Sequence, residues 1–217
     1  MLTGTLRRVA ARAPYANVMP NMDELLINTI NTLESEFRED ELALLALTSK
    51  IELPWRDRWA YSIHRQIKDA YDVSREWRRT DLAILDDNKP VALIELKAMY
   101  SFDATLCDKE INGYCELIQK DEQKALALSN GSCSVYTVLL AAHPHSSIPA
   151  KYDRVIKYRQ GINKAMNEHN TQEQVAAVAQ SNVEACLSHK KIIASGNFMG
   201  GKAFGVPASV YYWLVKA

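Results

Sequence analysis

One segment, residues 78–97, constrains the fold of this 217-residue chain more than any other part. It contains two β-rich apolar runs, residues 82–85 and 91–94, on either side of the turn-forming sequence Asp-Asp-Asn-Lys-Pro. This pattern predicts a strand, a short turn and a second strand. If Leu85 and Val91 close the turn as opposite partners, the register of every other pair in this hairpin follows.

That register places Asp81 opposite Glu95 at the end of the strand pair. Directly opposed residues on one face have Cβ atoms roughly 4.5–5.5 Å apart, and like charges there are destabilising. A positive charge is therefore expected between the two carboxylates. Strand side chains alternate between faces, so Lys97 shares the face of Glu95. Two carboxylates and one ammonium at one point predict a divalent-metal site with an amine beside it.

An ion cluster without metal is the alternative for the same residues. The register that pairs Asp81 with Glu95 also sets Arg79 opposite Lys97, so four alternating charges could neutralise one another. This alternative does not explain why such charges end an otherwise apolar strand pair, where unpaired polar groups are costly.

The pattern resembles the PD-(D/E)XK nuclease superfamily, the restriction-endonuclease-like fold. In that superfamily an Asp begins one strand of a hairpin and an acidic-x-Lys triplet closes the next, as Asp81, Glu95 and Lys97 do here. The order of elements is similar over residues 55–144, and Thr80 stands where the superfamily usually has Pro. The resemblance implies an α/β fold with a mixed β-sheet core flanked by α-helices.

The resemblance also implies a function, a divalent-metal-dependent DNA endonuclease of the restriction or repair type. Asp81, Glu95 and the backbone carbonyl of Leu96 would hold Mg²⁺, with Mn²⁺ as a substitute, because the ligands are hard oxygens. Lys97 would orient or deprotonate the attacking water, or neutralise charge in the transition state. The alternative is a catalytically inactive member of the fold that binds nucleic acid or a protein.

Further residues are candidates for an accessory role at this site. The helix after the triplet in the superfamily often offers a Gln or Lys, and a first-helix Glu acts in some relatives. An exposed polar helix face is the plainer interpretation of each. The candidates are Gln119, Lys120, Gln123 and Lys124 in the later helix, and Glu36 and Glu39 in the earlier one.

The formal net charge is zero, but the charge is unevenly distributed. Residues 21–52 hold eight acidic and two basic residues, residues 54–80 hold four and seven, and residues 150–217 hold four and nine. Basic stretches that flank the predicted site suit phosphate binding, although solvated helix faces would give the same counts. The DNA-binding candidates are Arg56, Arg58, Arg65, Arg78, Arg79 and Lys202.

Residues 196–202 match the spacing GxxxxGK of a phosphate-binding loop, which includes Lys202. Ala203 replaces the Ser or Thr that would hold magnesium, so a nucleotide site is not expected. We expect a loop here that contacts DNA or a partner subunit.

Length and periodicity predict one domain over residues 1–217. Residues 22–69 should be helical, residues 71–142 should form the catalytic sheet, and residues 150–217 should add helices and short C-terminal strands. One helix should begin at Pro54, with the stripe Trp55, Trp59, Ile63 and Ile67 facing the core. The whole sheet is expected to have about five strands.

The cysteines and the apolar runs predict a cytoplasmic protein without a membrane span. No apolar run approaches the roughly 20 residues that a transmembrane helix needs. Four cysteines without CxxC or Cys/His spacing are expected to be buried thiols of a reducing compartment. Residues 1–22 contain three arginines and no acidic residue, which favours a basic arm or a first helix over a transit sequence.

DNA is the expected partner, and a homodimer is the expected assembly. Two chains related by a two-fold axis would present two sites to the two strands of a duplex. The aromatic segment 211–214 is a candidate contact, and a strand packed in its own core is the alternative for the same residues.

Overall fold

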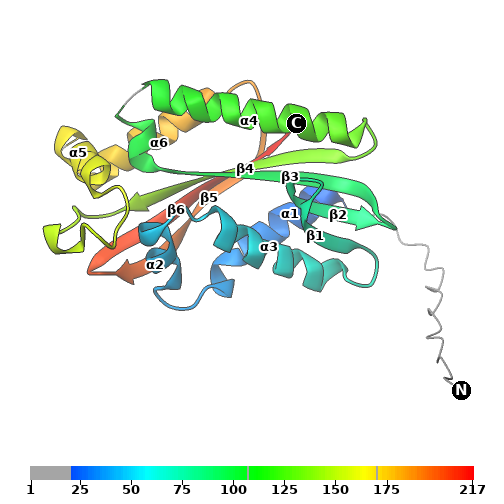
Figure 1. The fold of residues 1–217 in the computed structure, drawn as a ribbon, viewed down its shortest axis with the longest axis horizontal. Helices are drawn as coiled ribbons and strands as arrows, with labels where there is room; N and C mark the ends of the chain where they lie inside the picture. Colours follow the sequence, from blue (N-terminus) through cyan, green and yellow to red (C-terminus); the bar gives the residue numbers. More distant parts are fainter. Residues whose placement is uncertain (1–20, 107, 170) are drawn as a thin grey trace, which may run out of the picture.

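A mixed β-sheet runs through the whole structure and carries helices on both faces (Figure 1). The computed structural model describes residues 21–106, 108–169 and 171–217. Within these ranges six strands lie in the order β1-β2-β3-β4-β6-β5, with β3 and β4 parallel and the other neighbours antiparallel. The strands are β1 (Asp72–Trp77), β2 (Thr80–Asp86), β3 (Lys89–Tyr100), β4 (Ser134–Pro144), β5 (Lys191–Ala203) and β6 (Val206–Lys216).

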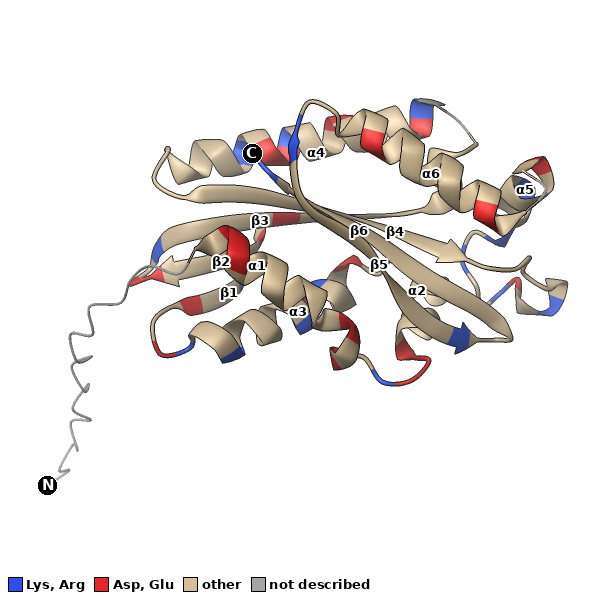
Figure 2. Cartoon of the chain, turned by 180° about the vertical axis from the view of Figure 1, so that it is seen from behind, with Lys and Arg blue, Asp and Glu red and all other residues tan. Residues whose placement is uncertain are grey.

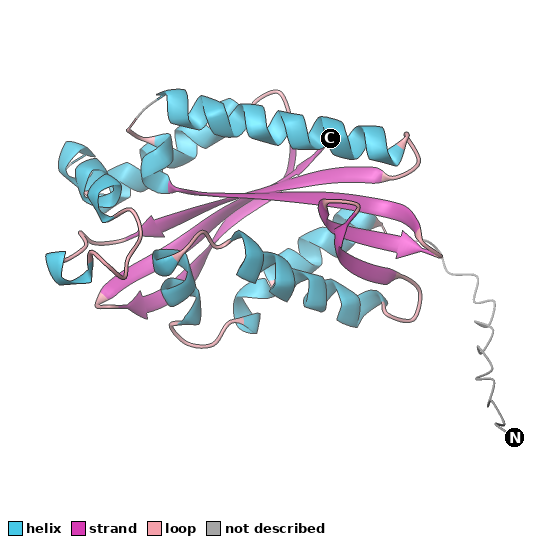
Figure 3. Cartoon of the chain, in the orientation of Figure 1, coloured by secondary structure: helices cyan, strands magenta, loops and turns pink. Residues whose placement is uncertain are grey.

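The helices form two layers (Figure 3). Helices α1, α2 and α3 cover one face of the sheet, α4 and α6 cover the other, and α5 lies at the end of α6 (Figure 1). None of the helices in the described ranges is both long and apolar enough to cross a membrane. The helices are α1 (Met22–Asn31), α2 (Glu41–Thr48), α3 (Glu52–Ile67), α4 (Asp108–Ser129), α5 (Arg159–His169) and α6 (Gln172–Cys186), with short 3₁₀ helices η1 (Leu33–Glu36), η2 (Ser101–Ala104) and η3 (Ala150–Tyr152).

Strand β3 is apolar on both faces because both faces are covered. Ile94 and Leu96 pack in the core under α1, α2 and α3, whereas Leu93 and Met99 belong to the apolar clusters on the α4 side. The predicted α/β class with helices on both faces of a mixed sheet is confirmed. The sheet has six strands in the described ranges where about five were expected.

The predicted apolar stripe of the 54–69 helix is confirmed in α3. Trp55, Trp59 and Ile63 are each fully buried. The indole Nε1 of Trp59 donates a hydrogen bond of 2.9 Å to Thr29 Oγ1 on α1, which joins the two helices. The helix begins at Glu52, so Pro54 lies within its first turn, where a missing N–H costs no intrahelical bond.

The C-terminal strands correct one expectation from the sequence. Strands β5 and β6 have 13 and 11 residues, and residues 196–202 lie inside β5 instead of forming a loop. Gly200 explains the difference, because a Cβ at this position would lie 2.8 Å from Ala208 O and 3.0 Å from Ala43 N. The glycine therefore allows α2 to approach the sheet closely. The hairpin turns at Phe204 and Gly205, both with positive φ.

The first of the helices expected in residues 150–217 begins only at Arg159. Its first part is replaced by the 3₁₀ helix η3 and a turn that ends at Tyr158. Tyr158 has φ 59°, a left-handed backbone conformation that an α-helix does not contain. Apolar periodicity alone did not reveal this break.

The segment 211–214 is part of the chain's own core. Tyr212, Trp213 and Leu214 are 4%, 3% and 0% exposed, because β6 lies between β4 and β5. The prediction that this segment contacts a second subunit is therefore wrong, and the alternative of a strand in its own core is confirmed. The homodimer itself stays a prediction.

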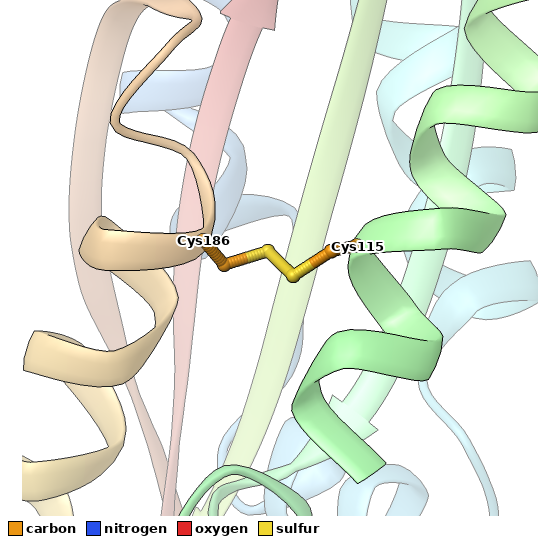
Figure 4. The surroundings of a disulfide bond; sticks show 2 residues. All are labelled: Cys115 and Cys186. Atoms are coloured by element: carbon orange, nitrogen blue, oxygen red, sulfur yellow. A yellow bond between two sulfur atoms is a disulfide. The ribbon is translucent and has the colours of Figure 1, made fainter. Parts of the chain in front are cut away.

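A disulfide bond joins the two helices of one layer (Figure 4). Cys115 on α4 and Cys186 at the end of α6 have Cα atoms 6.0 Å apart, although they are separated by 71 positions in sequence. The prediction that all four cysteines are thiols is wrong for this pair, since α4 and α6 pack side by side in a way that cysteine spacing does not reveal. Cys133 is a free thiol. Cys107 and residues 1–20 lie outside the described residues.

We expect Cys115→Ser or Cys186→Ser to lower the free energy of unfolding by about 4 kcal/mol, because the bond closes a loop of 71 residues in the unfolded chain. Chemical denaturation under non-reducing conditions measures the loss. Cys133→Ser is the matched control and should unfold like the wild type. Equal stability of Cys115→Ser and Cys133→Ser would contradict a stabilising bond.

Candidate functional site

The β2–β3 hairpin has the predicted register at its open end. Leu82 pairs with Ile94, so the next position along each strand sets Asp81 opposite Glu95. The turn is tighter than expected, because Asp86 pairs with Lys89. A shift between Ile84 and Leu85 takes up the one-residue difference, and the closing pair Leu85–Val91 does not form.

Strand β3 has a free edge beyond this point. Its pairing with β2 ends at Ile94, whereas its pairing with β4 continues to Tyr100. Backbone N–H groups on such an edge need other acceptors. Three carboxylates supply them: Asp81 Oδ2 accepts from Leu96 N (2.8 Å), Glu52 Oε2 from Ala98 N (3.2 Å) and Asp103 Oδ2 from Tyr100 N (2.9 Å).

Lys97 and Glu95 lie between the helical layers, where Figure 2 shows an acidic position in the middle of β3. The ammonium of Lys97 is 2.7 Å from Asp121 Oδ2 on α4 and 3.1 Å from the carbonyl oxygen of Leu96. Burial lowers the pKa of Lys97, but its hydrogen bond to Asp121 and the charge of that carboxylate outweigh burial, so the pKa is raised. Lys97 is therefore held as a cation.

Glu95 is the most perturbed carboxyl group of the site. It is 7% exposed, and its pKa is raised from 4.5 to about 8 by burial, by the charge of Asp81 and by a hydrogen bond between these two carboxyl groups. Burial also raises the pKa of Glu52, to which the charge of Asp81 contributes. Negative charge is thus concentrated at the free edge of β3 in excess of what Lys97 neutralises.

This donor set fits a hard divalent cation. Asp81 and Glu95 offer carboxylate oxygens beside the carbonyl of Leu96, the types of ligand that Mg²⁺ and Mn²⁺ take. A cation would also offset the repulsion that raises the pKa of Glu95. Across the described ranges, no three side chains of His, Cys, Asp or Glu are grouped so as to hold a metal ion by themselves.

The ion-cluster alternative fails in its predicted form, because Arg79 does not face Lys97. Arg78 and Arg79 form the turn between β1 and β2, where Trp77 pairs with Thr80 and both arginines have positive φ. The partner of Lys97 is Asp121, which also contacts Lys124 at 2.7 Å.

The accessory candidates on α4 are all exposed: Gln119, Lys120, Gln123 and Lys124. Only Lys124 contacts a residue of the site, through Asp121. Of the two N-terminal candidates, Glu36 forms an ion pair with Arg65, and Glu39 lines a surface hollow with Asp40 and Phe204. Neither contacts the β3 edge within the described ranges, and the carboxylate from the helical layer comes from Glu52 instead.

Some of the basic DNA-binding candidates form ion pairs within the chain, and others do not. Arg56 was expected to project outward but is 6% exposed and pairs with Asp57 and Glu76, because α3 packs on β1. Arg58 contacts Glu41, and Arg65 contacts Glu36. Arg65 is exposed as well, and the exposed candidates that form no ion pair within the described ranges are Arg78, which lies over the Trp77 ring at 4.7 Å, Arg79 and Lys202.

Sequence reasoning missed Glu52 and Asp121. Glu52 was counted only as part of an acidic stretch, although an acidic residue in the first turn of a helix that begins beside Pro54 is a usable signal. Asp121 continues the inward-facing spacing of Ile111, Ile118 and Ala125 and is only 15% exposed at its side chain. A carboxylate within an apolar helical stripe was the available signal.

Comparisons with protein-family models, with curated proteins and with solved structures found no match to this chain.

Replacing Glu95 by Gln should change how stability depends on pH in the absence of divalent cations. The wild-type carboxyl group is favoured in its protonated form, so its contribution is present below pH 4.5 and is lost as the pH rises towards about 8. Wild-type stability should therefore fall by about 5 kcal/mol relative to Glu95→Gln across this range, because the shift from 4.5 to about 8 corresponds to about 1.4 kcal/mol per pKa unit. Urea denaturation at several pH values measures the difference. A constant difference would contradict the raised pKa.

Millimolar magnesium should raise the melting temperature of the wild type at pH 8. A cation held ten times above its Kd stabilises by about 1.4 kcal/mol, which is about 2–4 °C for a chain of this size. Asp81→Ala should lose the shift, and Glu24→Ala, an exposed carboxylate on α1, should keep it. Equal shifts in these two variants would show that magnesium binds elsewhere.

Proposed function

We propose that this chain is a divalent-cation-dependent DNA endonuclease with a restriction-endonuclease-like fold, of the restriction or repair type. The observation that carries the proposal is the juxtaposition of Asp81 and Glu95 beside the ammonium of Lys97 at the free edge of β3. The order α3-β1-β2-β3-α4-β4 also agrees with the element order expected of the superfamily. The first observation supports a phosphodiesterase over a binding protein, and the second supports the fold alone.

The residues of the site have separable roles in phosphodiester hydrolysis. Mg²⁺ or Mn²⁺ bound by Asp81, Glu95 and the Leu96 carbonyl would supply charge neutralisation at the phosphate and a more acidic water. Lys97, kept cationic by Asp121, stabilises the negative charge that develops on the phosphate. Its position against the Leu96 carbonyl also places it where it can orient the attacking water.

Asp121 and Glu52 act through these groups. Asp121 fixes the position of the Lys97 ammonium from α4, and Lys124 shares that carboxylate. Glu52 bonds the N–H of Ala98 and so keeps the edge of β3 straight past Leu96. Both are positioning residues in this proposal.

The catalytically inactive alternative has one observation in its favour. Lys97, Asp121 and Lys124 form a connected set of ion pairs that would stabilise α4 against β3 without any cation. In that case Lys97→Ala would destabilise the fold, and nucleic acid or protein binding would persist without cleavage. Metal-dependent cleavage by the wild type would exclude this alternative.

Plasmid DNA incubated with magnesium or manganese should be cut by the wild type and left intact when EDTA is present. Asp81→Ala, Glu95→Ala and Lys97→Ala should each reduce the rate at least ~100-fold, because each removes a cation ligand or an electrostatic group. Glu116→Ala, an exposed carboxylate on α4, is the matched control. Circular dichroism establishes that each variant is folded. Wild-type rates in folded Lys97→Ala would refute the assignment.

A further inference from the structure

A hollow of about 430 Å³ lies beside the end of β3, lined by Phe102 and residues 153–161. This volume falls within the range of roughly 300–1,000 Å³ that small-molecule sites occupy. Gly161 allows the hollow to have Phe102 as a wall, because a Cβ at this position would lie 2.7 Å from the Phe102 ring. The hollow is thus formed by a turn and the first residues of α5, held against an aromatic side chain.

The side chains around this hollow combine positive charge with an exposed aromatic ring. Arg154 and Lys157 are exposed, and neither forms an ion pair within the described ranges. Arg159 is partly neutralised by Asp153 at 3.1 Å. Tyr158 is 51% exposed, while part of its ring packs against Tyr100 at a centroid distance of 5.2 Å. Exposed rings among unpaired cations are the means by which proteins hold unpaired nucleotides.

A chain of contacts connects this hollow with the candidate active site. Tyr100 ends β3 three residues after Lys97, about 10 Å along the strand at 3.3 Å per residue. It is buried and donates its hydroxyl to the carbonyls of Ala46 and Ser49, immediately before Lys50. Tyr158, Tyr100 and the loop ahead of α3 are therefore held together on one side of the β3 edge.

Lys50 lies between the hollow and the candidate active site. Its ammonium is 2.9 Å from the hydroxyl of Tyr114, whose own hydroxyl contacts Asp103 at 3.3 Å. Lys50 is exposed and forms no ion pair in the described part of the chain, although it precedes Glu52 by only two residues. A cation held by a phenol leaves its charge available to a phosphate, whereas a carboxylate partner would neutralise it.

We propose that the hollow at residues 153–161 binds an unpaired DNA nucleotide of the strand whose phosphate lies at Asp81 and Glu95, with Lys50 contacting a phosphate between them. This inference rests on the proposed function. Bases in a duplex are already stacked on one another, so the ring of Tyr158 is suited to a base that has left the stack. Arg154 and Lys157 supply the charge for its phosphate. The preferred substrate is therefore DNA with a single-stranded segment beside the cut, and continuous duplex is cut less readily.

Binding without divalent cations tests the inference apart from cleavage. Fluorescence anisotropy in EDTA compares a labelled single-stranded DNA oligonucleotide with a duplex of the same sequence. Tyr158→Ala should weaken single-strand binding by about 5- to 100-fold, the range for loss of one base–aromatic stack. Tyr158→Phe should retain it. Lys157→Ala should reduce the slope of log Kd against log salt by about 0.7, the value for one phosphate contact.

Matched controls come from the same chain. Tyr61 on α3 is 57% exposed, and Lys191 at the start of β5 is also exposed, so Tyr61→Ala and Lys191→Ala remove the same chemistry elsewhere. Both should bind single-stranded DNA like the wild type. Equal affinities of Tyr158→Ala and Tyr61→Ala would overturn the inference, as would a wild type that binds no single strand. Tighter, Tyr158-dependent binding of RNA of the same sequence would overturn DNA as the occupant.

The cleavage of two substrates separates this inference from the proposed function. The wild type should cut a duplex with a single-stranded overhang faster than a continuous duplex, and Tyr158→Ala should lose this preference while it still cuts the continuous duplex with magnesium. If the wild type never cuts DNA but binds single strands through Tyr158, the proposed function fails and the inference stands. If Tyr158→Ala and the wild type cut both substrates equally, the inference fails and the proposed function stands.

Discussion

The free edge of β3 is the constraint on which the arrangement of the site depends. A strand inside a sheet satisfies its backbone through two neighbours, but β3 has only β4 after Ile94. The N–H groups of β3 beyond Ile94 must be paired with other acceptors. A buried backbone donor without an acceptor can cost several kcal/mol and is rare in native structures. Carboxylates from β2, α3 and η2 supply the acceptors and so bring acidic groups to one line of the sheet. Because β2 no longer pairs with β3 beyond Ile94, three carboxylates take its place along this edge and lie at the site.

The same arrangement concentrates charge that the protein neutralises only in part. Asp121 and Lys97 form one close ion pair, whereas Glu95 faces Asp81, and burial and the charge of Asp81 favour the protonated form of Glu95. Perturbed carboxyl groups of this kind are enriched at functional sites. Structural ion-pair networks also perturb pKa values, and Lys124 on Asp121 is an example of such a contact. The Glu95–Asp81 pair, not the neutralised Lys97–Asp121 pair, distinguishes this site.

The sequence predicted what local rules determine. The assumed closing pair Leu85–Val91 does not form, and the Leu82–Ile94 register agrees with the prediction because a shift between Ile84 and Leu85 compensates. Four-residue spacing predicted the buried face of α3. The sequence could not predict contacts set by how layers pack, such as Cys115 with Cys186 or Glu52 with Ala98. Gly200 of β5 was misread because its role is to allow a close approach by α2, which local sequence does not encode. Asp121 could have been predicted in part, because helical spacing from the apolar stripe of α4 places it on the inward face of that helix.

The disulfide has a consequence for the turn that lines the hollow. Cys115 and Cys186 enclose β4, η3, α5 and the turn at residues 153–158 within one covalent loop. A protease that cuts an exposed bond at this turn, for example beside Arg154, would leave two fragments that remain joined through sulfur. The nicked protein would migrate as one chain until it is reduced, and α4 and α6 would stay tethered on the sheet. The turn that lines the hollow can therefore be cut without releasing the C-terminal fragment, which carries α6, β5 and β6, from the fragment that carries the candidate site.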